Sequence, residues 1–126
     1  MNAKEKIKFT QILKNNPTYS VLVKTDTKLE LDNMIKLPVA LPASELAVPT
    51  RWNQKVLMKE NDEKVYLCIE NIDKISIDEQ EKFLPLIKDK RAGNFKLPAN
   101  VQIVISAKDF AKVAPQIKKF ALFIES

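Results

Sequence analysis

Two short apolar runs with a helical pattern between them constrain the fold of this chain more than any other feature. The runs, at residues 64–69 and 101–106, have the length and near-continuous hydrophobicity of strands covered on both faces of a parallel sheet. Between them, Ser76 followed by Glu79 forms a capping box that predicts the start of a helix. Strand, helix and strand in this order predict a parallel sheet with right-handed crossovers.

The rest of the chain fits the same α/β architecture. Helices are expected at residues 3–15, at 51–59, and at 109–119 with a break at Pro115; strands are expected at 19–24, briefly at 39–41, and at 120–124. Residues 28–34 fit either a strand or a short helix. Pro85 predicts a kink or an early stop in the helix after Ser76, and Gly93 is positioned to end that helix. The predicted fold is a small three-layer α/β domain in which a parallel sheet has flanking helices.

Length and composition exclude several classes of protein. The 126 residues, 45% of them hydrophobic, predict one domain spanning residues 1–126 around a single core. Cys68 is the only cysteine and there is no histidine, which excludes internal disulfides, zinc sites and histidine-dependent catalysis. Cys68 lies within an apolar run, where we expect a buried, inert thiol. No run approaches the length of a membrane span, so we expect a cytoplasmic protein without a membrane anchor.

The charge balance permits an anionic partner without requiring one. The net charge of +5 comes from 21 basic and 16 acidic residues, and only Arg51 and Arg91 are arginines. Arginine is the residue that reads phosphate and guanine in a bidentate manner. Because the lysines are interleaved with acids along the chain, a solvated surface is the simpler interpretation.

Gly93 is the only glycine in the chain. Loops that bind phosphate through backbone N–H groups carry glycines, because side chains would block the approach of the anion to the main chain. This sequence therefore does not provide a phosphate-binding loop of the usual form.

The strand and turn at residues 65–75 resemble the Walker B strand of AAA+ ATPases, in which an apolar strand ends in Asp-Glu and continues into Ile-Asp-Lys. The resemblance places Glu70 at the position of the magnesium-site aspartate and Asn71 at the position of the glutamate that activates water. Asparagine has no carboxylate with which to polarise a water molecule. Both positions have changed from the family pattern.

The resemblance continues on both sides of this strand. Residues 96–101 look like the approach to the sensor 1 strand, and Lys108 stands where the family usually places an asparagine. Residues 113–120 are similar to the segment that carries the arginine finger, with Lys118 or Lys119 as the nearest counterpart. Neither lysine has the planar fork of arginine.

Upstream, residues 39–46 resemble the second-strand region of AAA+ modules. The segment 24–28 then stands where the P-loop would be. It has no glycine, and Asp26 and Glu30 would repel phosphate. Lys28 is interpreted either as a remnant of the P-loop lysine or as a surface lysine.

Five catalytic features are thus lost or altered together, which predicts a non-catalytic AAA+-like domain that acts as a protein-interaction or scaffold module. The expected partner is an AAA+ subunit, a second copy of the chain, or a complex that handles nucleic acid. No cofactor and no metal are predicted, and if the chain is an enzyme, it is a nucleotide hydrolase with an atypical site.

Three alternatives stay open. The first is a small basic nucleic-acid-binding protein whose contacts are the cations and the aromatic residue around one turn: Lys88, Lys90, Arg91, Phe95 and Lys96. The second is a metal-dependent enzyme that uses Glu70, Asp73 and Asp78 as an acidic cluster. The third is an unrelated small α/β domain whose buried strand ends in an acid by coincidence.

Overall fold

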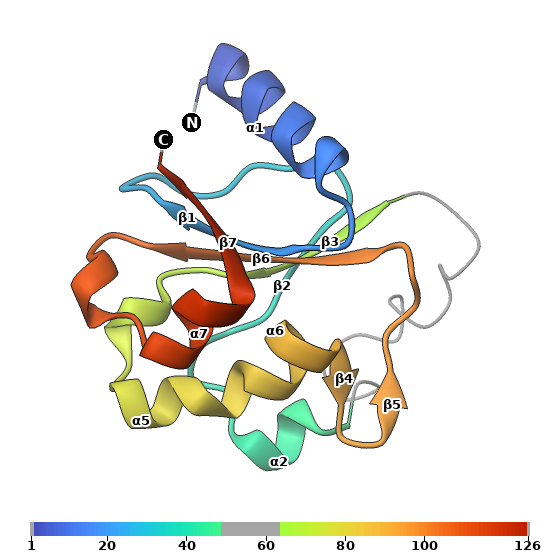
Figure 1. Ribbon diagram of the computed structural model, residues 1–126, viewed down its shortest axis with the longest axis vertical. Coiled ribbons are helices and arrows are strands. Elements are labelled where there is room, and N and C mark those ends of the chain that lie inside the picture. The colour runs from blue at the N-terminus through green and yellow to red at the C-terminus, as the bar shows by residue number, and fades with distance from the viewer. Residues whose placement is uncertain (1, 49–63, 126) are drawn as a thin grey trace.

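The computed structural model describes residues 2–48 and 64–125 and is built around a five-stranded sheet (Figure 1). The strands are β1 (Ser20–Lys24), β2 (Met34–Lys36), β3 (Val65–Ile69), β6 (Val101–Ala107) and β7 (Ala121–Glu125). Their order across the sheet is β2-β3-β6-β1-β7, and every neighbouring pair is parallel. The predicted parallel α/β sheet is confirmed.

Strand β6 lies at the centre of the sheet, and all of its residues are buried. Val104 is aligned with Val21 of β1 on one side and with Cys68 of β3 on the other. Because β1 lies between β6 and β7, the chain crosses over β1 on its way from β6 to β7. Because all five strands are parallel, their carboxyl ends lie at one edge of the sheet, the edge where open α/β sheets bind ligands.

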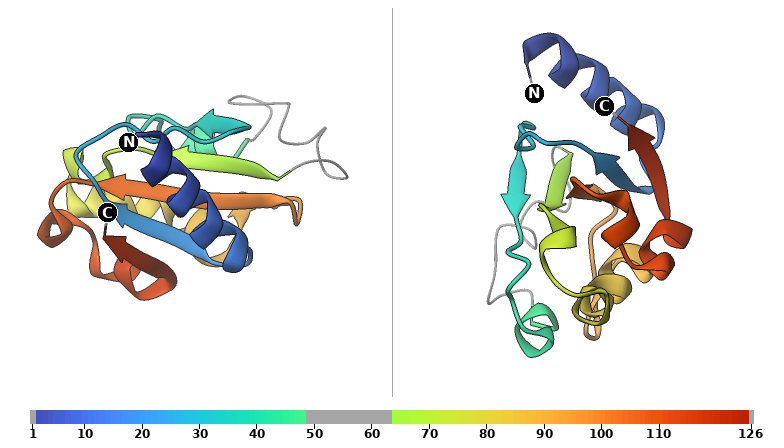
Figure 2. Two further views of the ribbon diagram at one scale, coloured as in Figure 1. Left: turned by 90° about the horizontal axis from the view of Figure 1, so that it is seen from above. Right: turned by 90° about the vertical axis from the view of Figure 1, so that its left-hand side faces the viewer.

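Helices cover both faces of the sheet, which gives the three layers expected (Figure 2). Helix α1 (Ala3–Asn15) covers one face, and on the other face lie α2 (Ala43–Leu46), α5 (Ile77–Gln80), α6 (Leu84–Asp89) and α7 (Pro115–Phe120). Two buried apolar clusters correspond to the two faces. In the described part of the chain, no helix is long and apolar enough to cross a membrane.

Helix α1 forms where the sequence predicts it. The side chain of Asn2 caps its first turn by accepting a hydrogen bond from the amide of Glu5 at 2.8 Å. Phe9 and Leu13, four residues apart, are buried against the sheet, whereas Ile7 on the outer side is 72% exposed. The helix thus contributes one narrow apolar stripe to the core.

The helical region after Ser76 is broken at the predicted proline. Ser76 caps α5 by accepting from the amide of Glu79 at 3.2 Å. A short 3₁₀ turn, Glu81–Phe83, follows, and Pro85 then lies in the first turn of α6, where its missing N–H has no intrahelical partner in any case. The prediction that Gly93 ends this helix is wrong: Lys90 ends it in the left-handed conformation at φ 53°.

Other expectations need correction. Residues 39–41 form a turn rather than a strand, because the amide of Leu41 donates to the carbonyl of Pro38 at 3.2 Å. Residues 28–33 are neither helix nor strand, and the edge strand is β2 instead. Pro115 begins α7 and does not interrupt a longer helix, while Phe110–Lys112 form a separate 3₁₀ turn. The helix expected at 51–59 lies outside the described residues.

A buried glutamine joins the helices on this side of the sheet. Gln80 is fully buried, and its Nε2 donates to the carbonyl oxygens of Ile75 and Lys112 at 3.1 and 2.8 Å. Its Oε1 accepts from the amide of Ala114 at 2.7 Å. With every polar atom of its amide bonded, Gln80 fixes α5 against the segment that leads into α7.

The single glycine serves a tight turn. Gly93 connects β4 (Arg91–Ala92) to β5 (Phe95–Lys96) with φ 60°, a conformation that glycine adopts at no steric cost. A Cβ atom at this position would lie 2.6 Å from the carbonyl oxygen of Ala47, at the end of α2. The hairpin therefore approaches α2 more closely than any side chain would allow.

We expect Gly93→Ala to destabilise the protein. The left-handed conformation costs an alanine about 1–2 kcal/mol, and the contact with Ala47 adds to this because backbone atoms must move. Urea unfolding measures the change. Asn94→Ala, at the exposed next position in the turn, is the control and should shift the free energy of unfolding by no more than about 0.5 kcal/mol. Equal effects of the two variants would contradict this account of Gly93.

Candidate functional site

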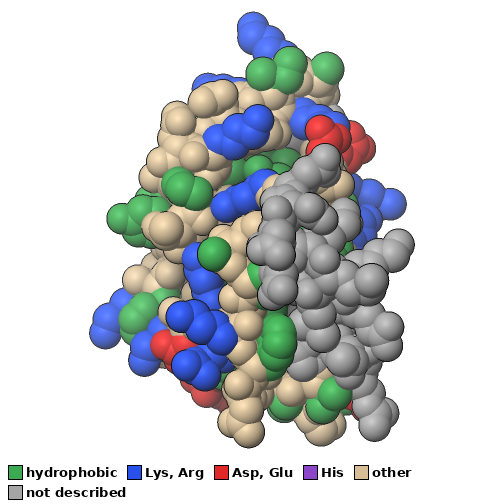
Figure 3. All heavy atoms as spheres, turned by 90° about the vertical axis from the view of Figure 1, so that its right-hand side faces the viewer, with side chains coloured by type: hydrophobic (Ala, Val, Ile, Leu, Met, Phe, Trp, Pro, Cys, Tyr) green, Lys and Arg blue, Asp and Glu red, His purple; other side chains and the backbone are tan. Residues whose placement is uncertain are grey.

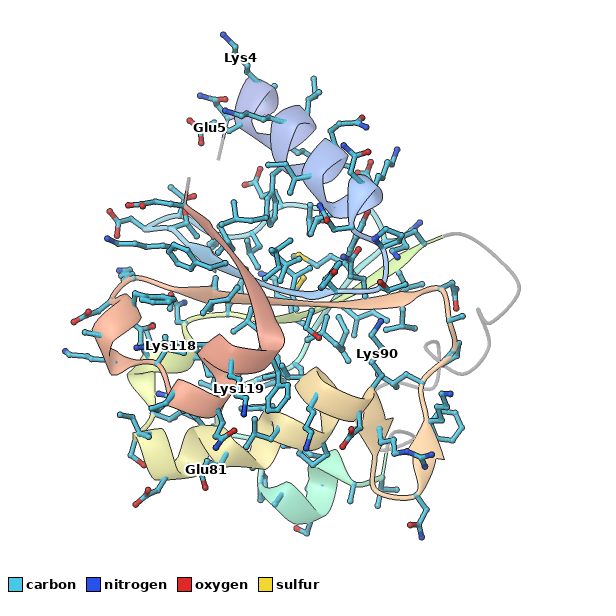
Figure 4. The ribbon with its side chains drawn as sticks, in the orientation of Figure 1. Lys4, Glu5, Glu81, Lys90, Lys118 and Lys119 are labelled. Carbon is cyan, nitrogen blue, oxygen red and sulfur yellow. The ribbon has the colours of Figure 1, made fainter. Side chains whose placement is uncertain are left out.

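The carboxyl edge of the sheet is where the sequence predicts the remains of a nucleotide site. The structure brings Glu70 and Asn71, which follow β3, and Lys108, which follows β6, to this edge. Lys28 is exposed on the connection from β1 to β2. Lys119 is not at this edge, because it lies on α7 close to the start of β7 (Figure 4).

Glu70 holds neighbouring parts of the chain together. Its Oε1 accepts a hydrogen bond from the amide of Leu29 at 3.0 Å, and its Oε2 lies 3.7 Å from the Nζ of Lys36 on β2. The side chain is only 19% exposed. The carboxylate therefore fastens the connection from β1 to β2 onto the end of β3, a role that the sequence did not indicate.

Asn71 and Asp73 shape the turn after β3. Asn71 adopts the left-handed conformation at φ 55°, which asparagine tolerates better than most residues, and its amide donates to the Oγ of Ser106 at 3.0 Å. The Oδ2 of Asp73 accepts from the amides of Lys108 and Asp109 at 3.2 and 3.0 Å. These contacts tie the turn after β3 to the end of β6.

The acidic cluster considered as a metal site does not assemble. Among the described residues, no group of three or more histidine, cysteine, aspartate or glutamate side chains is arranged to hold a metal ion. Glu70 and Asp73 bond to backbone amides, and Asp78 is exposed in the first turn of α5. These acids thus act as turn and helix-start residues.

Several amide groups in the connection from β1 to β2 donate hydrogen bonds to other groups of the protein. The amide of Thr25 donates to the carbonyl of Ala107 at 3.0 Å, that of Thr27 to the Oγ1 of Thr25 at 3.2 Å, and that of Leu29 to Glu70. Leu29 and Leu31 are buried against the sheet. The backbone of this segment is thus bonded to the protein at alternate amides, and its apolar side chains hold it on the sheet.

A pocket of about 290 Å³ opens at the carboxyl ends of β1 and β7. Its lining carries three acids and two lysines. They are Glu5, Asp26 and Glu125 with Lys24 and Lys108; Thr25 and Thr27 complete the wall. Lys24 lies 3.7 Å from Glu125, so part of its positive charge is already balanced. A pocket of this mixed charge does not favour a polyphosphate.

The lysines at the predicted arginine-finger segment rest on aromatic rings. The Nζ of Lys118 lies 4.6 Å from the centre of the Phe110 ring, and that of Lys119 lies 5.5 Å from the centre of the Phe120 ring. Lys88 of α6 approaches the same Phe120 ring at 5.0 Å. These cation–π contacts hold the lysines on the surface of their own domain.

The residues proposed for nucleic-acid contact spread over the end of α6 and the adjoining hairpin. Arg91 and Lys96 are directly paired between β4 and β5, and Phe95 is 37% exposed beside them. Lysine and arginine side chains also gather along this side of the molecule, with few acids among them (Figure 3). Lys90 differs from the others because its Nζ donates to the carbonyl of Thr18 at 2.8 Å.

Two polar residues that the sequence analysis did not single out fix the turn before β1. Gln102, fully buried in β6, donates from Nε2 to the carbonyls of Asn16 and Tyr19 at 2.8 and 3.0 Å. Lys64 donates to the carbonyl of Pro17 at 3.2 Å. Burial lowers the pKa of Lys64, and the nearby Lys90 ammonium lowers this pKa further. A glutamine within an otherwise apolar strand was the signal that could have revealed this contact.

Comparisons with known proteins bear on the fold. No family model and no curated protein matches the sequence. Among solved structures, the chain is similar to a DNA polymerase III gamma subunit-related protein from Thermotoga maritima, with a TM-score of 0.60 at 8% sequence identity. The match covers 94% of this chain but 44% of that one, so this chain spans less than half its length. The likeness supports the parallel α/β fold.

We expect Glu70→Ala to destabilise the fold by about 1–3 kcal/mol, because it leaves the buried amide of Leu29 without an acceptor. Glu70→Gln keeps a carbonyl oxygen for that amide and loses only a half-exposed ion pair, so it should cost less. Urea unfolding compares the two, with the exposed Glu30→Ala as control. If Gln and Ala cost the same, the hydrogen bond to Leu29 is not what Glu70 contributes.

Cys68 gives a prediction for alkaline pH. Burial raises the pKa of its thiol to about 12, helped by the Glu70 carboxylate and opposed by Lys36. Below the unfolded pKa of 9.0 the thiol is protonated in both states; above it, only the unfolded thiol ionises, so stability falls as the pH rises toward 12. The loss approaches about 1.4 kcal/mol per pH unit.

Urea unfolding of the wild type and of Cys68→Val, at about pH 8 and about pH 10.5, isolates this contribution because other groups titrate in both proteins. At the higher pH, the free energy of unfolding of the wild type should fall relative to that of the variant. A difference that is independent of pH would show that the native thiol ionises normally.

Proposed function

We propose that this chain is a non-catalytic, single AAA+-like domain that acts by binding a protein partner. One observation carries the proposal: where a P-loop would present free amides to phosphate, the amides of Thr25, Thr27 and Leu29 are bonded within the protein. Binding a nucleotide there would require these bonds to break.

The positions that differ from the AAA+ pattern support the same proposal, because each of them makes a structural contact. Glu70 binds the Leu29 amide, and Asn71 forms a left-handed turn. Lys108 donates its own amide to Asp73, while its side chain faces a pocket that also contains three acids.

The segment that resembles the arginine-finger region of AAA+ proteins carries lysines in place of the arginine. Lys118 and Lys119 lie over aromatic rings of their own chain and lack the planar fork that stabilises a transferring phosphoryl group. The domain therefore provides no arginine finger to the nucleotide site of a neighbouring subunit. Its surface is available to bind a protein partner.

The comparison adds context for the partner. The structural neighbour is related to a subunit of DNA polymerase III, which supports a role for this chain as a subunit of a larger, DNA-handling assembly. The nucleic-acid interface is the weaker alternative, because Lys90 bonds to Thr18 and Lys88 rests on Phe120.

Calorimetric titration with ATP and magnesium, followed by a phosphate-release assay, tests the proposal. We expect neither heat of specific binding nor hydrolysis above the buffer rate, because the amides of Thr25, Thr27 and Leu29 are already bonded within the protein. Glu70→Gln serves as the matched variant that distinguishes trace contamination from intrinsic activity. Micromolar binding with hydrolysis that Glu70→Gln removes would overturn the non-catalytic function.

A further inference from the structure

The outer edge of β7 has no partner strand in the described part of the chain. Strand β7 is last in the sheet order and pairs only with β1, from Ser20 aligned with Ala121 to Lys24 aligned with Glu125. Seen from above, β7 is the outermost strand on its side of the sheet (Figure 2, left). Its outward N–H and C=O groups thus offer a template for another strand.

The side chains of β7 are apolar and incompletely covered. None of its residues is buried, in contrast to β3 and β6, whose residues are all buried. Leu122 and Ile124 lie partly buried on the α1 side of the sheet. Phe123 points to the other side, is 41% exposed, and contacts the Phe110 ring, with 4.2 Å between ring centres and 56° between ring planes.

Natural edge strands usually carry a lysine, a proline or a bulge that prevents pairing with another chain. Strand β7 has the sequence Ala-Leu-Phe-Ile-Glu, without a lysine, a proline or a bulge, and its one charged residue, Glu125, stands at its end. Its pairing with β1 is regular over all five positions. The edge is therefore open to strand addition.

Charge at the two ends of β7 indicates which strand fits. Lys118 and Lys119 lie in the last turn of α7, immediately before the strand, and Glu125 ends the strand. The strand is thus basic at its beginning and acidic at its end. A second β7 in antiparallel orientation would place each acidic end beside a basic one.

We propose that β7 pairs antiparallel with β7 of a second copy of this chain, about a two-fold axis at Phe123. In this register Phe123 faces its counterpart directly, and Leu122 faces the counterpart of Ile124. The Phe110–Phe123 contact becomes part of a four-ring cluster across the interface. The two sheets join into one continuous sheet of ten strands, twice the five of a single chain.

The contact is small, because one five-residue strand pair buries less than the ~1,200 Å² that stable interfaces need. The dimer should therefore be weak and its population should rise with protein concentration. This inference rests on the proposed function in one respect, that the domain acts through a partner chain, and it names that partner. It does not depend on the nucleotide result, since self-association and ATP binding are separate measurements.

Sedimentation velocity of the purified chain over a range of concentrations tests the pairing. We expect a reversible monomer–dimer equilibrium that Phe123→Lys weakens by at least about tenfold, because the aromatic contact is lost and like charges meet at the axis. Ile77→Lys is the matched control, since Ile77 is 43% exposed but lies on α5, away from β7. A chain that remains monomeric at every concentration, or equal weakening by both variants, overturns the proposal.

A cysteine variant tests the register, because oxidation traps the pair even when the dimer is weakly populated. Residues that face each other across antiparallel strands have Cβ atoms about 4.5–5.5 Å apart, close to disulfide geometry. Cys68 is buried and gives no competing thiol. Mild oxidation of Phe123→Cys should therefore yield a covalent dimer, and Ile77→Cys should not. No cross-link from Phe123→Cys, or equal cross-linking by both, contradicts pairing at this axis.

Discussion

The short connection between β1 and β2 sets the form of this domain. It consists of the nine residues 25–33, and it must pass β6 and β3 to reach β2 at the far edge of the sheet. Three strand spacings amount to about 15 Å. Nine extended residues reach about 30 Å, whereas nine helical residues reach only about 13 Å. The connection therefore runs extended, and there is no length for a phosphate-binding loop followed by a helix.

Because no helix follows β1, other segments cover the face of the sheet on which α1 lies. Leu29 and Leu31 from the connection and Phe9 and Leu13 from α1 together bury this face. The extended backbone still needs hydrogen-bond partners, and Glu70 supplies one at the end of β3. Glu70, at the end of β3, is thus a structural residue that the short connection requires.

The sequence predicted what local patterns determine. The apolar runs became β3 and β6, the helix expected at residues 3–15 became α1, and the cap at Ser76 was found where expected. These features depend on neighbours within a few residues. Pro115 was interpreted as an interruption because its position at the start of a helix depends on where the preceding turn ends.

What the sequence did not predict depends on contacts between distant residues. Glu70 meets Leu29 across 41 positions, and Lys90 meets Thr18 across 72. The contact with Thr18 and the hydrogen bond from the Lys90 amide to the carbonyl of Leu86 together help to keep Lys90 in the left-handed conformation. The sequence had indicated that Gly93 would end the helix. No local pattern indicates such partners, so the candidate site could be located at the strand ends but its actual bonding could not be derived.

The stability of β7 depends on what lies against its outer side. Among the described strands it pairs with β1 only, and its apolar residues remain partly exposed. A partner strand would bury Phe123 and satisfy the outward backbone groups, so it would stabilise the folded strand by mass action, with the logarithm of the partner's concentration. Under the pairing proposed above, the folding of β7 and the association of two chains are therefore coupled.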